Sequence, residues 1–503
     1  MIEIDGRSLG LETFAEIVRR NGRAALAPEA REAIGSGRQA VEVVLETGEA
    51  IYGLNTGFGD LANVRIPREK LLDLQERLIL SHAAGVGEPL PEEVVRGMLL
   101  LRANTLARGH SGVRLELVEA LLALLNARVH PVVPSRGSVG ASGDLAPLAH
   151  LALPLLGRGE VWLDGVRRPA SDGLAHAGIE PLVLQAKEGL ALINGTQAMT
   201  SLLALACLEA RRLVRQQDLV GALSADALRG TDAAFDARVH ALRPYPGQVA
   251  SAENLWRLLQ GSAIRESHRS GDIRVQDPYC LRCMPQVHGA VRDVLTDVEW
   301  KVLIEMNAVT DNPLVFPADG DLISGGNFHG EPMAIAADTL CIALAELGSI
   351  SERRIEKLTN HAFSGLAPFL VPDAGVNSGF MIAQVTAAAL VSENKILCHP
   401  ASVDSIPTSA DKEDHVSMGM TAALKLRRVA DQVTTILGIE LAAAAQGIDL
   451  LRPLRSSEPL EALHAAVRAE IAPWETDRVM APDLETAERL LRRELDNHWT
   501  RLR

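Results

Sequence analysis

Six long stretches with the pattern of amphipathic helices dominate the chain after residue 197. Helices of this length need one another to bury their apolar stripes, so the pattern predicts a large antiparallel helical bundle. The stretches are residues 197–235, 285–308, 333–359, 378–398, 414–447 and 484–502.

The low aromatic content supports the same fold class. Only 3% of the 503 residues are Phe, Trp or Tyr, so the core must be built from Ala, Leu, Val and Ile. This composition favours close-packed helices over a sandwich or a propeller. We therefore predict a mainly α chain with two domains, a smaller mixed N-terminal domain over 1–196 and the long-helix bundle over 197–503. Shorter helices are expected at 70–80, 96–106 and 115–127, and a small hairpin near 157–166.

Charge and cysteine usage exclude several classes of partner. The net charge of -14 opposes binding to a phosphate backbone, so no nucleic acid is expected. Five cysteines form an odd count that indicates reduced thiols and a cytoplasmic enzyme. Cys280 and Cys283 form a Cys-x-x-Cys without a second pair, and no H-E-x-x-H occurs, so no metal is expected. Neither a signal peptide nor an apolar run long enough to span a membrane is found, and no membrane partner is predicted.

The stretch Ser138–Pro147 is small, pliant and followed by a helix start. Asp144 is the expected N-cap, which places Ser142 just before a helix N-terminus. In such a turn the amide nitrogen of Gly143 can attack the carbonyl of Ala141, because neither residue has a bulky side chain. Loss of water then closes a five-membered ring, and dehydration of Ser142 adds an exocyclic methylidene. The sequence thus allows an electrophile made from the backbone, and the structural alternative is a Gly-rich turn that caps a helix.

Six further polar stretches stand out along the chain. They are the glycine loop 51–60 with Tyr52, the helix end Ser81-His82, the turn Asn194-Gly195-Thr196, the loop 274–282 with Gln276, Tyr279 and Arg282, the turn 324–332 with Phe328, and the stretch 411–418 with Glu413. The last is expected to open a helix and to put its acids in the first turn. Each also has a structural interpretation, such as a packing Tyr, a capping His, a turn-forming Asn or a surface Arg.

Taken together and in this order, the seven motifs resemble those of the aromatic amino acid ammonia-lyases, which use a 4-methylidene-imidazol-5-one (MIO) group. The resemblance covers positions 51 to 418. It implies that Ala141, Ser142 and Gly143 form MIO and that no external cofactor is needed. It also implies a homotetramer whose active sites are shared between subunits.

The resemblance further implies a role for each site residue. Tyr52 removes the β-proton of the substrate as a general base, and Arg282 holds the substrate carboxylate. Asn194, Gln276 and Tyr279 hydrogen-bond the substrate and the ring, and Phe328 packs against the prosthetic group. Whether MIO captures the substrate through its amine or through its ring stays open.

Within this family, the residues expected around the substrate ring favour histidine. A polar His82 and an anionic Glu413 suit an imidazole, whereas a phenyl ring would leave the buried carboxylate unpaired. The expected reaction is the elimination of ammonia from L-histidine to give trans-urocanate, the first step of histidine degradation. A tyrosine or phenylalanine ammonia-lyase or an aminomutase is the alternative, and a non-catalytic helical scaffold is a remote one.

Three departures from the family pattern lie near these motifs. Asp411-Lys412 precedes Glu413, where Asn-Gln is more usual, and Lys412 could alter the partner of that acid and loosen the assignment of the substrate. Met284 and His288 stand where Gln and Met are frequent. None of these positions is itself an expected site residue.

Overall fold

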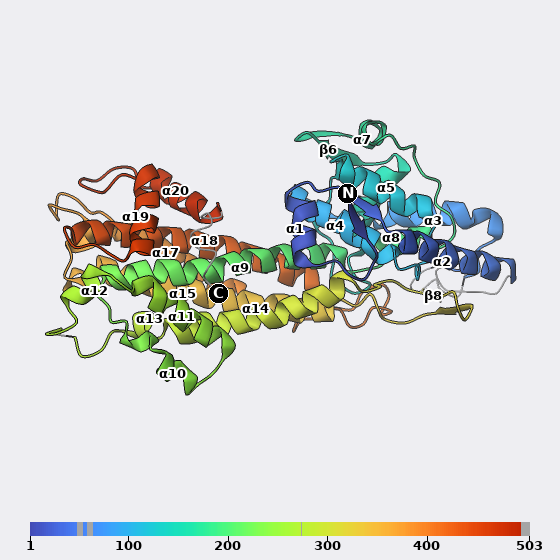
Figure 1. Ribbon diagram of the computed structural model, residues 1–503. Coiled ribbons are helices and arrows are strands. Elements are labelled where there is room, and N and C mark those ends of the chain that lie inside the picture. The colour runs from blue at the N-terminus through green and yellow to red at the C-terminus, as the bar shows by residue number, and fades with distance from the viewer. Residues whose placement is uncertain (48–53, 58–63, 273, 494–503) are drawn as a thin grey trace. The chain divides into compact units, whose positions relative to one another are not determined.

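The computed structural model describes residues 1–47, 54–57, 64–272 and 274–493. The fold is mainly helical, as predicted, and the strands within the described residues form small sheets (Figure 1). The chain divides into two compact units. The first contains Met1–Leu208, Glu299–Asp338 and Pro400–Leu424, and the second contains Glu209–Val298, Thr339–His399 and Lys425–Arg503.

These units have different bounds from the predicted domains 1–196 and 197–503. The first unit includes two later segments of the chain, which carry Phe328 and Glu413. The predicted boundary divides the chain at one position in the sequence. The compact units, by contrast, are defined by contacts between segments that are remote in sequence. A single boundary could therefore not describe both units.

The first unit combines short strands with helices. A parallel pair joins β1 (Ile2–Ile4) to β2 (Ala24–Leu26), and antiparallel pairing joins β3 to β5, β4 to β6 to β7, and β8 to β9. The hairpin of β6 (Glu160–Leu163) and β7 (Val166–Pro169) confirms the predicted one. The remaining strands are β3 (Val86–Pro89), β4 (His130–Pro131), β5 (Pro134–Arg136), β8 (Leu314–Phe316) and β9 (Asp321–Ile323).

Helix α4 (Glu92–Leu106) is the centre of the first unit, because every residue from Val94 to Leu106 is buried. It packs against α1 (Leu11–Arg19), α5 (Leu115–Asn126) and α6 (Leu145–Ala152). The other helices of this unit are α2 (Pro28–Thr47), α3 (Leu71–His82), α7 (Ala170–Ala177) and α8 (Glu188–Ile193), with 3₁₀ helices at Arg68–Lys70 and Leu153–Leu156.

The predicted long helices are present with modest changes at their ends. They are α9 (Gln197–Ala227), α14 (Met284–Met306), α15 (Glu331–Thr359), α17 (Met381–Leu397), α18 (Gly419–Leu450) and α20 (Ala481–Arg492). Four of them, α9, α14, α15 and α18, contribute residues to both units. The second unit adds α10 (Ala237–Ala241), α11 (Pro246–Leu259), α12 (Ala263–Ser267), α13 (Tyr279–Arg282), α16 (His361–Ser364) and α19 (Glu458–Glu470), with 3₁₀ helices at Ala233–Phe235 and Pro368–Leu370.

Buried charges join the helices of the second unit. Asp218 of α9 accepts hydrogen bonds from Ser251 and Asn254 of α11 and from His288 and Arg292 of α14. Glu440 of α18 accepts from Arg354 of α15 at 2.5 and 2.8 Å. His288, one of the three departures, therefore belongs to the packing of this helical bundle.

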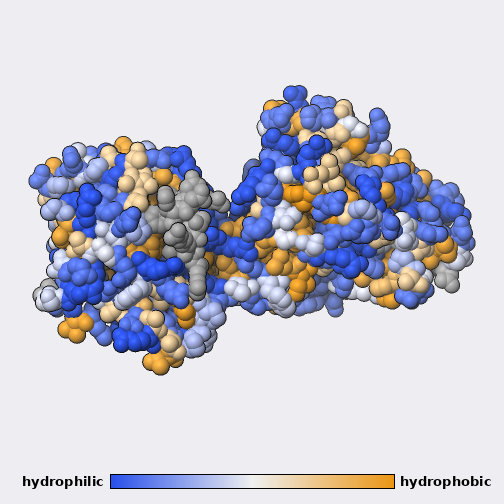
Figure 2. Space-filling model, in the orientation of Figure 1, coloured by the Kyte–Doolittle hydropathy of each residue, from blue (hydrophilic) through white to orange (hydrophobic). Residues whose placement is uncertain are grey.

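Two long helices, α15 and α18, also pass a length and composition test for membrane spans. In their most apolar windows 67% and 83% of the residues are buried inside the protein. Helices packed in a protein core pass the same test, so it is weak evidence for a membrane. On the face shown in Figure 2, hydrophobic residues lie scattered among hydrophilic ones.

Candidate active site

The turn that contains Ser142 has a backbone that requires glycine. Gly143 has a φ of +72°, and a Cβ added there would overlap the carbonyl oxygen of Gly195. Gly143 and Gly195 pair in an isolated β-bridge, and the amide of Asp144 donates to the Gly195 carbonyl at 2.7 Å. The turn is therefore pressed against the backbone that follows α8.

Asp144 stands at the N-cap position of α6, but its side chain makes no hydrogen bond to that helix. Its Oδ2 instead accepts from the amides of Ala198 at 3.0 Å and Met199 at 2.9 Å, and its Oδ1 accepts from Ser138. The prediction that Asp144 caps its own helix is thus wrong, because the N-terminus of α9 offers these amides to it. Burial raises the pKa of Asp144 to about 6.

Asn194 follows α8 and points its amide at the Ser142 turn. Its Nδ2 donates to the carbonyl oxygen of Ser142 at 2.9 Å. Two predicted site residues, 52 positions apart in the sequence, are thus in direct contact. Asn194 is buried, so this hydrogen bond is protected from water.

Glu413 lies in a loop and not in a helix. Helix α18 begins only at Gly419, after Met418 with a φ of +54°, so the prediction of a first-turn acid is wrong. The loop is held instead by local pairing of Thr408 with Glu413 and by the amide of Met418, which donates to the Val139 carbonyl at 2.8 Å. The segment before Gly419 is thus held by these contacts and not by the hydrogen bonds of a helical turn.

The carboxylate of Glu413 accepts hydrogen bonds from three hydroxyl groups. Oε1 accepts from Ser142 Oγ at 2.7 Å, and Oε2 accepts from Thr408 Oγ1 at 2.8 Å and Ser409 Oγ at 2.9 Å. The side chain of Glu413 is therefore bound by hydroxyl groups. Lys412, which was expected to influence this acid, is exposed.

His82 ends helix α3 and is half-buried. Its Nδ1 lies 2.9 Å from the carbonyl oxygen of Leu78. Because a carbonyl only accepts, Nδ1 carries a proton, and in the neutral ring Nε2 is an acceptor. Burial lowers the pKa of His82, although the Leu78 carbonyl and the charge of Glu413 oppose this effect. His82 is therefore neutral at pH 7.

Phe328 lies half-buried in the turn before α15. Two residues on, the amide of Gly330 donates to the Gly140 carbonyl at 3.4 Å. The hydroxyl of Ser417 donates to the same carbonyl at 2.9 Å. The Ser142 turn is thus tied to the segments that carry Phe328 and Glu413.

Gln276, Tyr279 and Arg282 lie in the second unit, where they share one turn. Gln276 is exposed, and the ring of Tyr279 is 69% exposed. The Arg282 guanidinium lies 4.5 Å from the centroid of that ring, and its Nε donates to the carbonyl of Asp277 at 3.0 Å. Tyr52, the expected base, lies outside the described residues.

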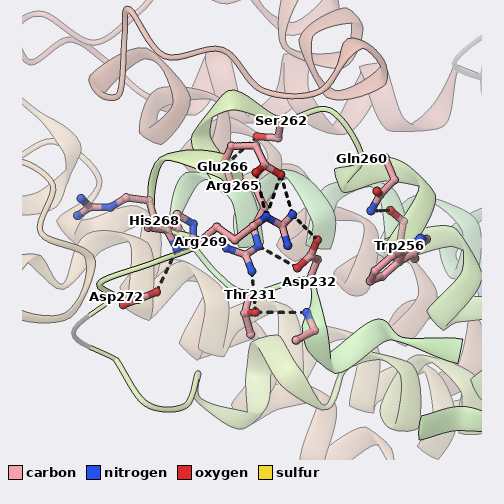
Figure 3. A network of polar contacts seen from close by, with 12 residues as sticks. Thr231, Asp232, Trp256, Gln260, Ser262, Arg265, Glu266, His268, Arg269 and Asp272 are labelled. Carbon is pink, nitrogen blue, oxygen red and sulfur yellow. Dashed lines mark hydrogen bonds and ion pairs between the residues drawn. The ribbon is translucent and has the colours of Figure 1, made fainter. Parts of the chain in front are cut away.

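A network of polar contacts in the second unit precedes this turn (Figure 3). Asp232 accepts from Arg265 Nε at 2.9 Å and from Arg269 Nη2 at 3.3 Å. Next to it, the amide of Thr231 donates to Asp277 Oδ2 at 2.6 Å. The last contact holds Asp277, whose carbonyl accepts the hydrogen bond from Arg282.

Several residues that hold the site could not be identified from the sequence. Asp144 and Ser417 had a signal, because they lie within the motifs at 138–147 and 411–418. The hydroxyls of Thr408, Ser409 and Ser417 come from a loop whose backbone geometry was not predicted. Among the residues that the structure describes, no group of three His, Cys, Asp or Glu side chains could hold a metal ion.

A family model described as aromatic amino acid lyase matches residues 9–469, and the chain belongs to this family. The histidine ammonia-lyase of Anaeromyxobacter dehalogenans is 55% identical over 496 residues, which covers 97% of this chain and 98% of that protein. The crystal structure of histidine ammonia-lyase from Trypanosoma cruzi has a TM-score of 0.91 at 46% identity, covering 98% of this chain and 93% of that one. The resemblance and the fold class inferred from the sequence are confirmed.

A relative with another reaction has an equally similar fold. The tyrosine aminomutase from Streptomyces globisporus has a TM-score of 0.92 at 38% identity, covering 98% of this chain and 97% of that one. The fold alone therefore does not determine which amino acid a member of this family accepts. This selectivity has to come from the residues around Ser142.

Proposed function

We propose that this chain is a histidine ammonia-lyase, which eliminates ammonia from L-histidine and gives trans-urocanate, the first step of histidine degradation. The enzyme is a carbon–nitrogen lyase, as its family and its histidine ammonia-lyase relatives indicate. The observation that carries the choice of histidine is that Glu413 binds the Ser142 hydroxyl and that its charge also acts on the neutral His82.

The residues of the Ser142 turn fit the formation of MIO. Ala141 carries only a methyl group, and Gly143 takes up a positive φ against Gly195 that a larger residue could not adopt. When formed, MIO supplies an electrophile that compensates for the poor leaving ability of ammonia. No external cofactor is needed in this proposal.

Asn194 acts on the carbonyl of Ser142. In MIO this oxygen becomes the carbonyl oxygen of the ring, so the hydrogen bond from Nδ2 remains possible after ring closure. A donor at this oxygen withdraws electron density from the ring, and it also holds the ring in place. Asn194 thus both orients and activates the group.

His82 and Glu413 bind the substrate imidazole. Nε2 of neutral His82 accepts a hydrogen bond from an imidazole N–H. Glu413 is held in place through Oε2 by Thr408 and Ser409, and its Oε1 faces Ser142. A phenyl ring would leave Oε1 of this carboxylate without a donor, at a cost of about 1–3 kcal/mol.

The remaining roles rest on the family pattern. Arg282 binds the substrate carboxylate, Tyr279 and Gln276 add hydrogen bonds, Tyr52 takes the β-proton, and Phe328 packs against the prosthetic group. Since Nε of Arg282 donates to the Asp277 carbonyl, the substrate carboxylate would be bound by the terminal nitrogens.

The assembly and location belong to the same proposal. We infer a cytoplasmic homotetramer in which several subunits contribute to each active site. Exposed Gln276 and Tyr279 support this arrangement, because residues with these roles have to be buried around a substrate in the assembled enzyme.

Purified protein with L-histidine tests this function. The absorbance of urocanate should rise, and mass spectrometry should find the peptide containing Ser142 lighter by two waters. The variant Ser142→Ala should lose both signals, and deamination that survives in this variant would contradict the proposal. A cinnamate or a β-amino acid formed from tyrosine or phenylalanine, without urocanate from histidine, would support the alternative lyase or aminomutase. An unmodified peptide mass without activity would support a scaffold.

A further inference from the structure

Arg102 is a fully buried cation in the middle of α4. Its Nη1 donates to the carbonyl of Asn194 at 3.2 Å, to Oε1 of Gln197 at 2.9 Å and to the carbonyl of Thr310 at 3.1 Å. Nε and Nη2 are buried and have no hydrogen-bond partner among the described residues. Burial lowers the pKa of Arg102 only to about 10, so the side chain keeps its charge at neutral pH.

A buried charge that binds only neutral acceptors is costly to the fold. Asp311 is the opposite charge that acts on Arg102, and it is itself paired with Lys187 at 2.8 Å. A hydrophobic residue in this position would remove the buried charge, but it would leave the carbonyls of Asn194 and Thr310 and Oε1 of Gln197 without this donor. Arg102 therefore joins the backbone at 194 to the backbone at 310 in a way that an apolar side chain could not.

Arg102 holds the turn at Asn194–Gly195, and this turn contacts the Ser142 turn. Behind Gly195 there is no space for a side chain, because an added Cβ would overlap Nη1 of Arg102. In front, Asn194 Nδ2 donates to the Ser142 carbonyl at 2.9 Å, and the Asp144 amide donates to the Gly195 carbonyl at 2.7 Å. The backbone at 194–195 is thus fixed between Arg102 and the residues that form the ring.

We propose that Arg102 is a positioning residue for the formation of MIO: it holds the Asn194–Gly195 backbone, which in turn keeps Gly143 in the geometry for ring closure. This inference rests on the proposed function. It assigns to Arg102 a role in making the prosthetic group and no contact with the substrate.

Ring closure needs no oxidant or co-reactant. The nitrogen of Gly143 forms a bond to the carbonyl carbon of Ala141, and its proton moves to the carbonyl oxygen. The resulting hydroxyl leaves as water with the amide proton of Ser142, which forms the C=N bond. A second water takes the hydroxyl of Ser142 and its Cα hydrogen. The first step depends on the distance between two backbone atoms, so it is sensitive to small movements of the turn.

Arg96 supplies a matched control, because it is also a buried arginine of α4 that binds backbone carbonyls. It donates to the carbonyls of Val18, Leu125 and Ile17 at 3.0, 3.1 and 2.6 Å, and its Nη1 lies 3.2 Å from Nε2 of His130. Among the hydrogen bonds of the described residues, none joins Arg96 to the 194–195 backbone. The variants Arg102→Gln and Arg96→Gln therefore remove similar groups from the same helix. Only the first releases the turn.

The experiment makes the chain by cell-free translation, so that the turn starts unreacted, and follows the mass of the peptide containing Ser142 over time in soluble protein with a native circular dichroism spectrum. We expect the loss of two waters to be about 10- to 100-fold slower in Arg102→Gln, because a misplacement of about 1 Å slows intramolecular steps by this order. In Arg96→Gln the rate should stay near that of the wild type.

A wild-type rate of water loss in folded Arg102→Gln would overturn the inference, and so would equal slowing in Arg96→Gln. If Arg102→Gln does not fold, Gln197→Leu removes one acceptor and leaves the arginine in place. This variant should slow the water loss by a smaller factor, and a wild-type rate would overturn the inference too. A wild-type protein that never loses water would instead contradict the proposed function itself.

Discussion

The hydroxyl of Ser142 donates a hydrogen bond of 2.7 Å to Oε1 of Glu413, across 271 positions of sequence. In the proposed function, formation of MIO would remove this hydroxyl as water, and the same carboxylate oxygen would then become available to a substrate. Oε2 keeps its bonds to Thr408 and Ser409, which hold the carboxylate where it is. Glu413 is therefore ready for an imidazole once the turn has reacted.

The first prediction tests the charge of Glu413. Glu413→Gln keeps the size of the side chain but loses the charge-assisted hydrogen bond to the imidazole, which is worth about 1.5–3 kcal/mol. We expect kcat/KM for L-histidine to fall by about 10- to 100-fold. Thr408→Val should have a smaller effect, because it removes only one of two hydroxyls at Oε2. Urocanate absorbance at varied histidine concentration measures both, and equal kcat/KM values for wild type and Glu413→Gln would exclude this role.

A second prediction concerns His82. His82→Leu fills the space but removes the acceptor Nε2, so kcat/KM for histidine should fall about tenfold or more. Relative turnover of phenylalanine should rise, because the site becomes more apolar. The control Ser81→Ala should change both little, since the carbonyl of Leu78 still orients the imidazole of His82. A histidine preference that survives His82→Leu would show that another residue selects the imidazole.

The third prediction links Asp144 to pH. The pKa of Asp144 is about 6 in the folded protein, against an ordinary value of 3.8. Between these values the folded state binds more protons than the unfolded state, so stability is fully present below pH 3.8 and falls as the pH rises to about 6. The difference corresponds to about 3 kcal/mol.

Asp144→Asn should remove this contribution and flatten the fall in unfolding free energy between pH 4 and about 6, as measured by urea denaturation. The control Asp164→Asn lies in the exposed turn between β6 and β7 and should leave the pH profile unchanged. Parallel pH profiles of wild type and Asp144→Asn would contradict the assignment.

The fourth prediction tests the buried pair of Arg354 and Glu440. Arg354→Met leaves the carboxylate of Glu440 buried without its cation, so unfolding free energy should fall by about 3–5 kcal/mol. The double variant Arg354→Met with Glu440→Met should recover a large part of this loss, because no charge is left buried. Denaturant unfolding of both variants measures this, and a double variant less stable than the single one would refute the argument.

Local patterns in the sequence predicted the helices well. The apolar spacing of residues 333–359 and 378–398 was enough to find α15 and α17, because a helix closes its hydrogen bonds within four residues. The glycines beside Ser142 likewise marked a turn. The structure brings together Asn194 and Ser142, two residues that the family pattern assigns to the site, and their roles stay a prediction.

Contacts between remote segments were beyond such patterns. Asp144 is of a residue type favoured at the N-cap and stands at that position of α6, yet its side chain accepts from the amides of Ala198 and Met199. Glu413 was expected in a helix because acids are favoured in first turns, whereas pairing with Thr408 keeps it in a loop. In both cases the conformation depends on a hydrogen-bond partner from another segment of the chain. The residues next to Asp144 or Glu413 in the sequence do not show which partner this is.

The Ser142 turn takes its shape from residues that are translated much later, including Asn194, Gly330, Glu413 and Ser417. A ribosome must release the chain beyond Ser417 before all these partners can meet. A truncated polypeptide would therefore remain chemically inert, and the cell would be spared a reactive group on unfinished protein.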